Sequence, residues 1–314
     1  MMSSSDQRFL GIEIGGTKLQ VSVGTAMGTL IETARANVPK GAGGGEIRAI
    51  ILDLCRQLIA NHAVSGVGAG FGGPVDIRTG TIARSHQVEG WDGFSLRSWL
   101  EGTLDLPTAV ENDSNTAALA EARLGAGSGH NPVFYTNLGS GVGGGLVHNG
   151  RITHGRPPGE AEIGHLRLSP GGPIVESVCS GWALDQRLRA LAAEHADSTL
   201  ARMLCDMTSG ESRVLPEALA GGDVHARQAL DETVEAFGFA LSHVVHLVSP
   251  EIIVIGGGLS HLGDVFVAPL KIALASNIME AMLPAPDIRT ATLGEEVVPT
   301  GAILLAADAA AQTH

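Results

Sequence analysis

The sequence predicts an α/β fold built in two parts. Short apolar runs alternate with longer segments of helical periodicity, as in proteins whose helices pack on sheets. A strand, a glycine turn and a second strand near the N-terminus are repeated in the middle of the chain, which indicates two related halves. The length of 314 residues agrees, since it corresponds to about two domains of ordinary size.

Each element follows from a local pattern. Short apolar runs bounded by turn residues predict strands, and these cover residues 9–14, 19–23, 64–70, 108–111, 133–138, 146–148 and 251–255. Apolar residues that recur every three or four positions, or runs rich in alanine, predict helices over residues 46–61, 116–124, 182–193, 225–248 and 300–311. We expect a smaller domain of residues 1–115 with 300–314, and a larger domain of residues 116–299.

Composition and charge exclude several classes of protein. Twenty Lys and Arg residues stand against 33 Asp and Glu, a net charge of −13, which argues against nucleic-acid and membrane-surface partners. Three widely spaced cysteines indicate a reducing compartment. The N-terminus lacks the apolar region of a signal peptide, and the most apolar stretch, 237–259, contains a proline and a charge. We therefore expect a cytoplasmic protein without a membrane span.

Three glycine clusters suit contact with a nucleotide, because glycine lets backbone N–H groups approach phosphate oxygens. In the first, the hydroxyl of Thr17 adds a donor; in the second, five glycines in the seven residues 139–145 surround Ser140. The third follows a buried strand, where a base or ribose could lie. Taken alone, each cluster also fits an ordinary turn. The residues expected to bind the nucleotide are Gly15, Gly16, Thr17, Lys18, Gly139, Ser140, Gly141, Gly256, Gly257 and Gly258.

Acidic and amide side chains beside these turns suggest chemistry on a hydroxyl group. Glu13 precedes the first turn and can reach Mg²⁺, directly or through water. Asp113 at a strand-to-helix junction can accept a proton from a hydroxyl, and Asn112 can bind a neighbouring one; a helix cap is the competing interpretation. Glu162 and His165, followed by Glu176, can read sugar hydroxyls, although either of the first two alone also fits a solvated loop.

In this order, from Phe9 to the C-terminus, the motifs resemble the ROK family (repressor, open reading frame, kinase). The resemblance implies a two-domain, actin-like, hexokinase-type (RNase H-like) fold with an interdomain cleft. It also implies a homodimer and an ATP- and Mg²⁺-dependent kinase acting on the terminal hydroxyl of a hexose, glucose or fructose first. On this reading Asp113 is the general base and Glu13 serves Mg²⁺. The implied sugar-binding residues are Gly72, Gly73, Asn112, Glu162, His165 and Glu176.

The chain departs from the family pattern at several positions. Glu13 stands where most members have Asp, Gly72 where proline is usual, and Ala161 where glycine is common. Most members also carry a cysteine-rich zinc motif between the histidine and the third sugar-binding acid. Here residues 166–175 contain no cysteine and the segment is shorter, so we predict no structural zinc. Two prolines, at 170 and 173, are expected to stiffen this segment instead.

Several alternatives stay open. The substrate could be an N-acetylhexosamine, N-acetylmannosamine or N-acetylglucosamine, and the donor could be polyphosphate rather than ATP. The chain could instead be a catalytically silent sugar-sensing regulator; a DNA-binding repressor is disfavoured by the acidic charge and the eight residues before Phe9. Histidines assigned to surface or loop positions without a role are His62, His86, His154, His195 and His261.

Overall fold

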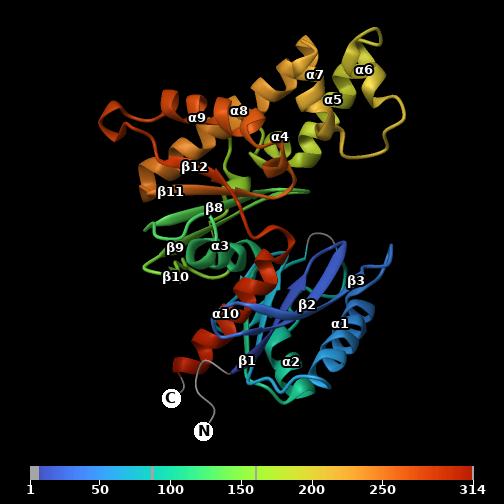
Figure 1. Ribbon diagram of the computed structural model, residues 1–314, viewed down its shortest axis with the longest axis vertical. Helices are drawn as coiled ribbons and strands as arrows, with labels where there is room; N and C mark the ends of the chain where they lie inside the picture. The colour runs from blue at the N-terminus through green and yellow to red at the C-terminus, as the bar shows by residue number, and fades with distance from the viewer. Residues whose placement is uncertain (1–6, 86–87, 160, 313–314) are drawn as a thin grey trace. The chain divides into compact units, whose positions relative to one another are not determined.

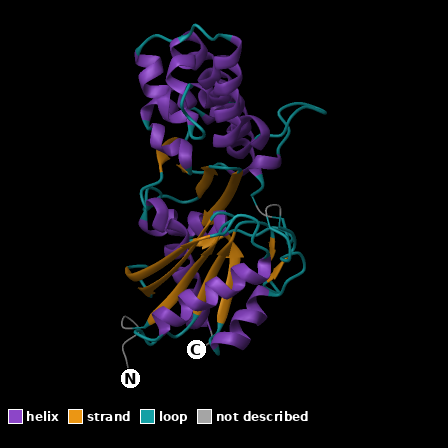
Figure 2. Ribbon diagram, turned by 90° about the vertical axis from the view of Figure 1, so that its right-hand side faces the viewer, coloured by secondary structure: helices purple, strands orange, loops and turns teal. Residues whose placement is uncertain are grey.

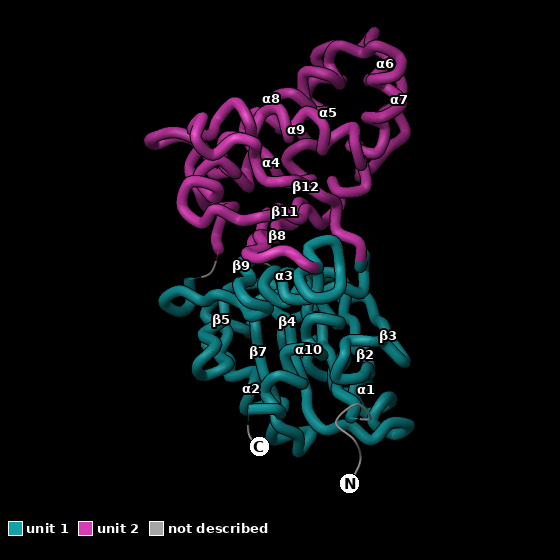
Figure 3. The backbone as a smooth tube through the Cα atoms, turned by 60° about the vertical axis from the view of Figure 1, so that its left-hand side comes forward, with its two compact units in different colours: residues 1–128, 145–160, 293–314 teal, residues 129–144, 161–292 magenta. Residues whose placement is uncertain are grey.

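The computed structural model describes residues 7–85, 88–159 and 161–312, and has the mixed α/β character expected from the sequence (Figure 2). The chain divides into two compact units (Figure 3). Unit 1 comprises residues 1–128, 145–160 and 293–314, and unit 2 comprises residues 129–144 and 161–292. His86, one of the histidines assigned to a surface or loop position, lies outside the described residues.

Unit 1 is built on a five-stranded sheet. The first three strands pair antiparallel, and the other two run parallel to the first. In spatial order the strands are β3 (Leu30–Asn37), β2 (Lys18–Thr25), β1 (Arg8–Ile14), β4 (Val67–Phe71) and β7 (Thr108–Asn112). The remaining elements are the ribbon β5 (Val75–Asp76) and β6 (Thr81–Ile82), and the helices α1 (Gly44–Ile59), α2 (Leu96–Leu104), α3 (Asp113–Leu124), α10 (Val297–Gln312) and η6 (Gly294–Glu296).

The two faces of this sheet bury different helices. Leu10 and Ile12 of β1 belong to the same buried cluster as the apolar side chains of α1. The residue between them, Gly11, faces α10, where a Cβ atom would overlap the backbone oxygen of Pro299. Alternate strand residues point to opposite faces, so α1 and α10 cover opposite sides of the sheet (Figure 1). Glycine at position 11 is what lets α10 lie directly on β1.

Unit 2 contains most of a second five-stranded sheet and most of the remaining helices. Its central pair, β8 and β11, is parallel, as is β11 with β12. The spatial order is β10 (Arg151–Ile152), β9 (Val142–His148), β8 (Val133–Leu138), β11 (Ile252–Gly256) and β12 (Asp287–Thr290); β9 from residue 145 onward and β10 belong to unit 1. The helices are α4 (Glu176–Cys179), α5 (Gly181–Glu194), α6 (Thr199–Leu204), α7 (Leu215–Ala220), α8 (Val224–Val248), α9 (Asp264–Asn277), η2 (Ile163–His165), η3 (Glu211–Val214), η4 (Gly258–Leu262) and η5 (Glu280–Met282).

The expected strands and helices are all present, with ends shifted by a few residues. The sequence reading missed β3, α2, α6, α7, α9 and β12, among other short elements. One turn is shorter than predicted: β9 already begins at Val142, because the backbone N–H of Gly143 donates to Asn137 Oδ1 (2.9 Å) and its carbonyl accepts from Thr136 Oγ1 (2.8 Å). The second glycine turn is therefore limited to residues 139–141.

The compact units divide the chain at other residues than the expected domains. Helix α3 falls in unit 1, since it packs against α10: a Cβ atom on Gly301 would overlap the backbone oxygen of Thr116. Residues 145–160 also fall in unit 1, where Gly150 O accepts two hydrogen bonds from Arg123. Within the described part of the chain, no helix is both long and apolar enough to cross a membrane.

Candidate active site

The junction of β7 and α3 holds the predicted base and its neighbouring amide. Asn112 is the N-cap of α3, and its Oδ1 accepts from the backbone N–H groups of Ser114 (2.9 Å) and Asn115 (3.2 Å). Its Nδ2 donates to the carbonyl of Gly73 (3.1 Å). The cap interpretation is thus confirmed for Asn112, and the same side chain joins two of the predicted sugar-binding residues.

Asp113 is the first residue of α3, where the positive end of the helix dipole favours a carboxylate. A Cβ atom on Gly72 would lie 3.4 Å from Asp113 Oδ2 and 3.4 Å from the backbone oxygen of Ile14. The family's usual proline at position 72 would place its ring in this space, whereas glycine leaves it open. Gly72 also lines a small pocket with Gly15 and Gly16, so unit 1 brings the first glycine turn and this loop together.

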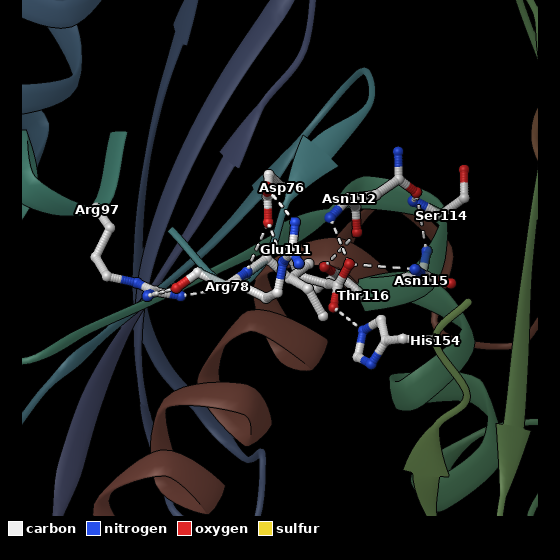
Figure 4. A network of polar contacts seen from close by, with 10 residues as sticks. Asp76, Arg78, Arg97, Glu111, Asn112, Ser114, Asn115, Thr116 and His154 are labelled. Carbon is white, nitrogen blue, oxygen red and sulfur yellow. Dashed lines mark hydrogen bonds and ion pairs between the residues drawn. The ribbon is translucent and has the colours of Figure 1, made fainter. Parts of the chain in front are cut away.

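Sequence reasoning missed the pair formed by Glu111 and His154. Glu111 is buried, and its Oε1 accepts from Asn112 N (2.8 Å) and from Asn115 Nδ2 (3.1 Å). Its Oε2 lies 2.6 Å from His154 Nε2. Figure 4 shows the two side chains facing each other. His154 was expected to have no role, and its 43-residue distance from Glu111 along the chain left no signal for the pairing. Because Glu111 accepts a hydrogen bond from the backbone of Asn112, it stabilises the junction that carries Asp113.

Glu13 lies in a site suited to a cation. Burial raises its pKa from 4.5 to about 7; Lys18 opposes this shift and the charge of Asp113 adds to it. Lys18 Nζ lies 3.5 Å from Glu13 Oε2, and this oxygen accepts no hydrogen bond from the described residues. A half-desolvated carboxylate near a second one fits Mg²⁺, which prefers oxygen ligands and is often held by one or two carboxylates.

In unit 2, Val142 contacts Glu176 and the 3₁₀ turn that carries Glu162 and His165. The backbone N–H of Val142 donates to Glu176 Oε2 (2.9 Å). A Cβ atom on Gly164 would overlap the carbonyl oxygen of Val142, so the 3₁₀ turn η2 packs directly on β9. Glu162 directly precedes η2 and His165 ends it, and both are exposed. The start of β9 thus contacts the carboxylate of Glu176 and the turn that carries Glu162 and His165.

Gly141 is needed for the position of Glu176, since a Cβ atom there would lie 2.5 Å from Glu176 Oε2. We expect Gly141→Ala to push the carboxylate aside and to raise KM for the sugar about tenfold, the effect of losing one charged hydrogen bond. The matched change Gly139→Ala meets no atom within 4 Å, so KM for the sugar is expected to stay unchanged. Because Gly139 lines the cavity of unit 2, any effect is expected on KM for ATP. Steady-state kinetics of both variants check this; equal effects on the sugar would contradict it.

The second and third glycine clusters line a cavity of about 720 Å³ in unit 2. Its lining includes Gly139, Ser140 and Gly258, and α5 contributes Trp182 and Arg189. This volume is within the range of small-ligand pockets. The cavity gives Gly139, Ser140 and the start of η4 a common surface on which a nucleotide can lie.

Two of the three glycines at the end of β11 serve packing. A Cβ atom on Gly256 would overlap the hydroxyl of Tyr135, and one on Gly257 would lie 2.6 Å from the backbone of Leu138. Gly257 also has φ of +78°, which only glycine adopts readily. Of this cluster, Gly258 is the residue that lines the cavity.

The predicted residues fall into two sets, each described within its own unit. Unit 1 holds Glu13, Gly15, Gly16, Thr17, Lys18, Gly72, Gly73, Asn112 and Asp113. Unit 2 holds Gly139, Ser140, Gly141, Glu162, His165, Glu176, Gly256, Gly257 and Gly258. Their assignment to sugar, nucleotide and metal stays a prediction.

The two units and their glycine turns define an α/β protein of the actin-like, hexokinase type. A crystal structure of a ROK family glucokinase from Streptomyces griseus, in complex with glucose and AMPPNP, matches with a TM-score of 0.83 and 28% identity, covering 96% of this chain and 99% of that chain. The ROK hexokinase from Thermus thermophilus matches with a TM-score of 0.81 and 28% identity, covering 98% of this chain and 100% of that chain. The ROK family model matches residues 9–309, and the chain belongs to the ROK family.

Sequence similarity agrees with this assignment. The glucokinase of Halalkalibacterium halodurans is 31% identical over 306 residues, which cover 93% of this chain and 92% of the relative. The family resemblance seen in the motifs is thereby confirmed over nearly the whole length.

Proposed function

We propose that this chain is an ATP-dependent kinase that phosphorylates the terminal hydroxyl of a hexose, with glucose as the first candidate. The β7–α3 junction carries the proposal: a carboxylate at a helix N-terminus stands beside an amide held by three hydrogen bonds. The similarity to glucokinases supports the choice of sugar.

In the proposed reaction, Asp113 accepts the proton of the sugar hydroxyl while the hydroxyl oxygen attacks the γ-phosphorus of ATP. The bond from the γ-phosphorus to the bridging oxygen breaks, and ADP leaves. Asn112, Glu162, His165 and Glu176 hold the ring hydroxyls, since these groups together donate and accept hydrogen bonds.

The nucleotide is assigned to the glycine turns. The N–H groups of Gly15 and Gly139 already donate to the carbonyls of Lys18 (3.2 Å) and Gly141 (3.0 Å) within these turns. The phosphates are therefore assigned to the N–H groups of Gly16, Thr17, Ser140 and Gly141, and the adenosine to the cavity that Gly258 lines. Glu13 would hold Mg²⁺, directly or through water, and the ion supplies neutralisation of the β- and γ-phosphate charge when it is bound. The proposal assigns no residue of this site to zinc.

An ADP-release assay tests the proposal with ATP as donor, and measurement of the sugar phosphate tests it with polyphosphate, because transfer from polyphosphate releases no ADP. The panel comprises glucose, fructose, mannose, N-acetylglucosamine and N-acetylmannosamine, each with ATP and Mg²⁺ or with polyphosphate. Turnover on glucose with ATP is the expected result. Turnover on an N-acetylhexosamine alone would reassign the substrate. No turnover on any sugar, with glucose still raising Tm, would favour a sensing role.

We also propose that the protein is a cytoplasmic homodimer. Helices α8 and α9 of unit 2 expose large apolar side chains: Leu247 is 83% and Ile272 is 73% exposed, and Phe239 lies on the same helix as Leu247. Burying such side chains between two copies is favourable. Sedimentation equilibrium is expected to give twice the chain mass, and Ile272→Glu is expected to shift it toward the monomer; a monomeric wild type would contradict the proposal.

A further inference from the structure

The ten residues 166–175 form a hairpin in unit 2. At its neck the backbone N–H of Val175 donates to the carbonyl of Leu166 (2.9 Å). Leu166 directly follows His165, and Val175 directly precedes Glu176. Because paired strand backbones lie about 4.8 Å apart, the neck brings the two proposed sugar-binding residues next to each other.

Contacts of Arg167 close the rest of the hairpin. It pairs with Ile174 in an antiparallel bridge, and its Nη1 donates to the carbonyl of Gly172 (2.7 Å). Gly171 at the tip has φ of +71°, a conformation that glycine adopts without strain. The guanidinium therefore ties the first arm to the far side of the turn.

Both ends of the hairpin are attached to one residue of β9. On one side Gly164 packs on the carbonyl of Val142, and on the other Glu176 accepts from the N–H of Val142. The path from Val142 through His165, the hairpin and Glu176 back to Val142 is a closed ring of contacts within unit 2. A ring of this kind fixes the spacing of His165 and Glu176 only if the hairpin keeps its shape.

The side chains of this segment do not fit a structural zinc ion. Zinc is bound by thiolate, imidazole or carboxylate groups, and residues 166–175 contain no Cys, His, Asp or Glu. Cys179 lies beyond Glu176, its thiol faces the carbonyl of Thr233 (3.8 Å), and burial raises its pKa to about 12. The donors that would hold zinc in this segment are therefore missing from the sequence itself.

We propose that the hairpin 166–175, closed by Arg167, does without metal what a zinc-bound loop does in other members of the family: it holds His165 and Glu176 at the spacing that sugar binding needs. Arg167 is a positioning residue, since it acts through these two. The inference rests on the proposed function for the role of His165 and Glu176, whereas the hairpin's own stability can be measured without it.

Three arginine variants test the positioning role. Arg167→Ala is expected to raise KM for the sugar about tenfold, the effect of one charged hydrogen bond, with kcat and KM for ATP within about twofold. Arg167→Lys keeps one donor and is expected to recover part of the loss. Arg227→Ala, which removes an exposed arginine of α8, is the control and is expected to match the wild type. A sugar KM unchanged in Arg167→Ala would overturn the proposal.

A pair of glycine variants separates position from general stability. Gly171 and Gly222 have φ of +71° and +75°, and a Cβ atom on either meets nothing within 4 Å. Alanine therefore imposes a similar backbone strain at both sites. We expect similar losses in Tm, with a raised sugar KM for Gly171→Ala alone; an equal rise in both would indicate a purely structural effect.

Hydrogen exchange provides a readout that does not depend on catalysis. In Arg167→Ala the amides of peptide 164–178 are expected to exchange faster than in the wild type. Treatment of the wild type with 1,10-phenanthroline is expected to change neither this exchange nor Tm, and elemental analysis is expected to find no stoichiometric zinc. One zinc per chain with faster exchange after chelation would overturn the proposal. If the wild type phosphorylates no sugar, the proposed function fails while the exchange data still decide the hairpin's part.

Discussion

Replacing Asp113 by Asn is expected to lower kcat by about 10³-fold, within the range that general-base catalysis contributes. Asparagine keeps the size of the side chain but cannot take the proton of the attacking hydroxyl. The fold is expected to survive, because the cap of α3 is made by Asn112 and not by Asp113. Calorimetry is expected to find sugar Kd within a few-fold of the wild-type value.

The control for this variant is Asp53→Asn, which removes an exposed carboxylate from α1. It is expected to leave kcat unchanged. If Asp113→Asn keeps near-normal turnover, Asp113 is not the base. If it loses sugar binding in proportion to turnover, its role is orientation of the substrate rather than proton transfer.

The helix cap and the catalytic interpretation of residues 112–113 turn out to be compatible. Asn112 caps α3 with its oxygen while its nitrogen reaches Gly73. The sequence pattern could predict this junction because capping residues and the strand before them are local signals. It could not predict Glu111 with His154, since that contact depends on how β10 and the loop after it pack on α3.

The glycines illustrate a second limit of local patterns. Their number and clustering predicted close approach of backbone to a ligand. At Gly141, Gly256 and Gly257 the structure instead shows a neighbour of this same chain in the space of the missing Cβ: Glu176, Tyr135 and Leu138. A glycine reveals that something lies close, but only tertiary packing reveals what it is.

Missed elements have a similar cause. Strand β3 alternates weakly and buries little, because it lies at the edge of its sheet. Helix α9 contains Pro269, a residue that usually argues against a helix interior. In both cases tertiary contacts, with β2 and with α8, outweigh the local preference.

Glu13→Gln is expected to have opposite effects on stability and activity. The native pKa of Glu13 is about 7 against an ordinary value of 4.5, so the folded chain binds more protons than the unfolded chain between these values. The stability that protonation of Glu13 contributes is therefore fully present below pH 4.5 and is lost as pH rises toward 7. Glutamine removes this loss, and at about 1.4 kcal/mol for each pKa unit the gain in the free energy of unfolding above pH 7 is at most about 3.5 kcal/mol.

Tm measured without ligands from pH 4.5 to 8 tests the stability effect. The variant and the wild type are expected to coincide at the acid end and to diverge by a few degrees above pH 7. Glu235→Gln, an exposed position in the middle of α8, is expected to show no such divergence. Parallel curves across the whole range would contradict the desolvated state of the Glu13 carboxylate.

The effect of Glu13→Gln on activity is expected to be a loss. If Glu13 holds Mg²⁺, glutamine is expected to lower kcat/KM for MgATP about 10- to 100-fold, the usual loss when a group that supports a metal is removed. Added Mg²⁺ is expected to recover part of it. A variant that is both more stable and fully active would separate Glu13 from the metal. A variant that is more stable and less active would mean that this partly buried carboxylate is kept because the reaction uses it.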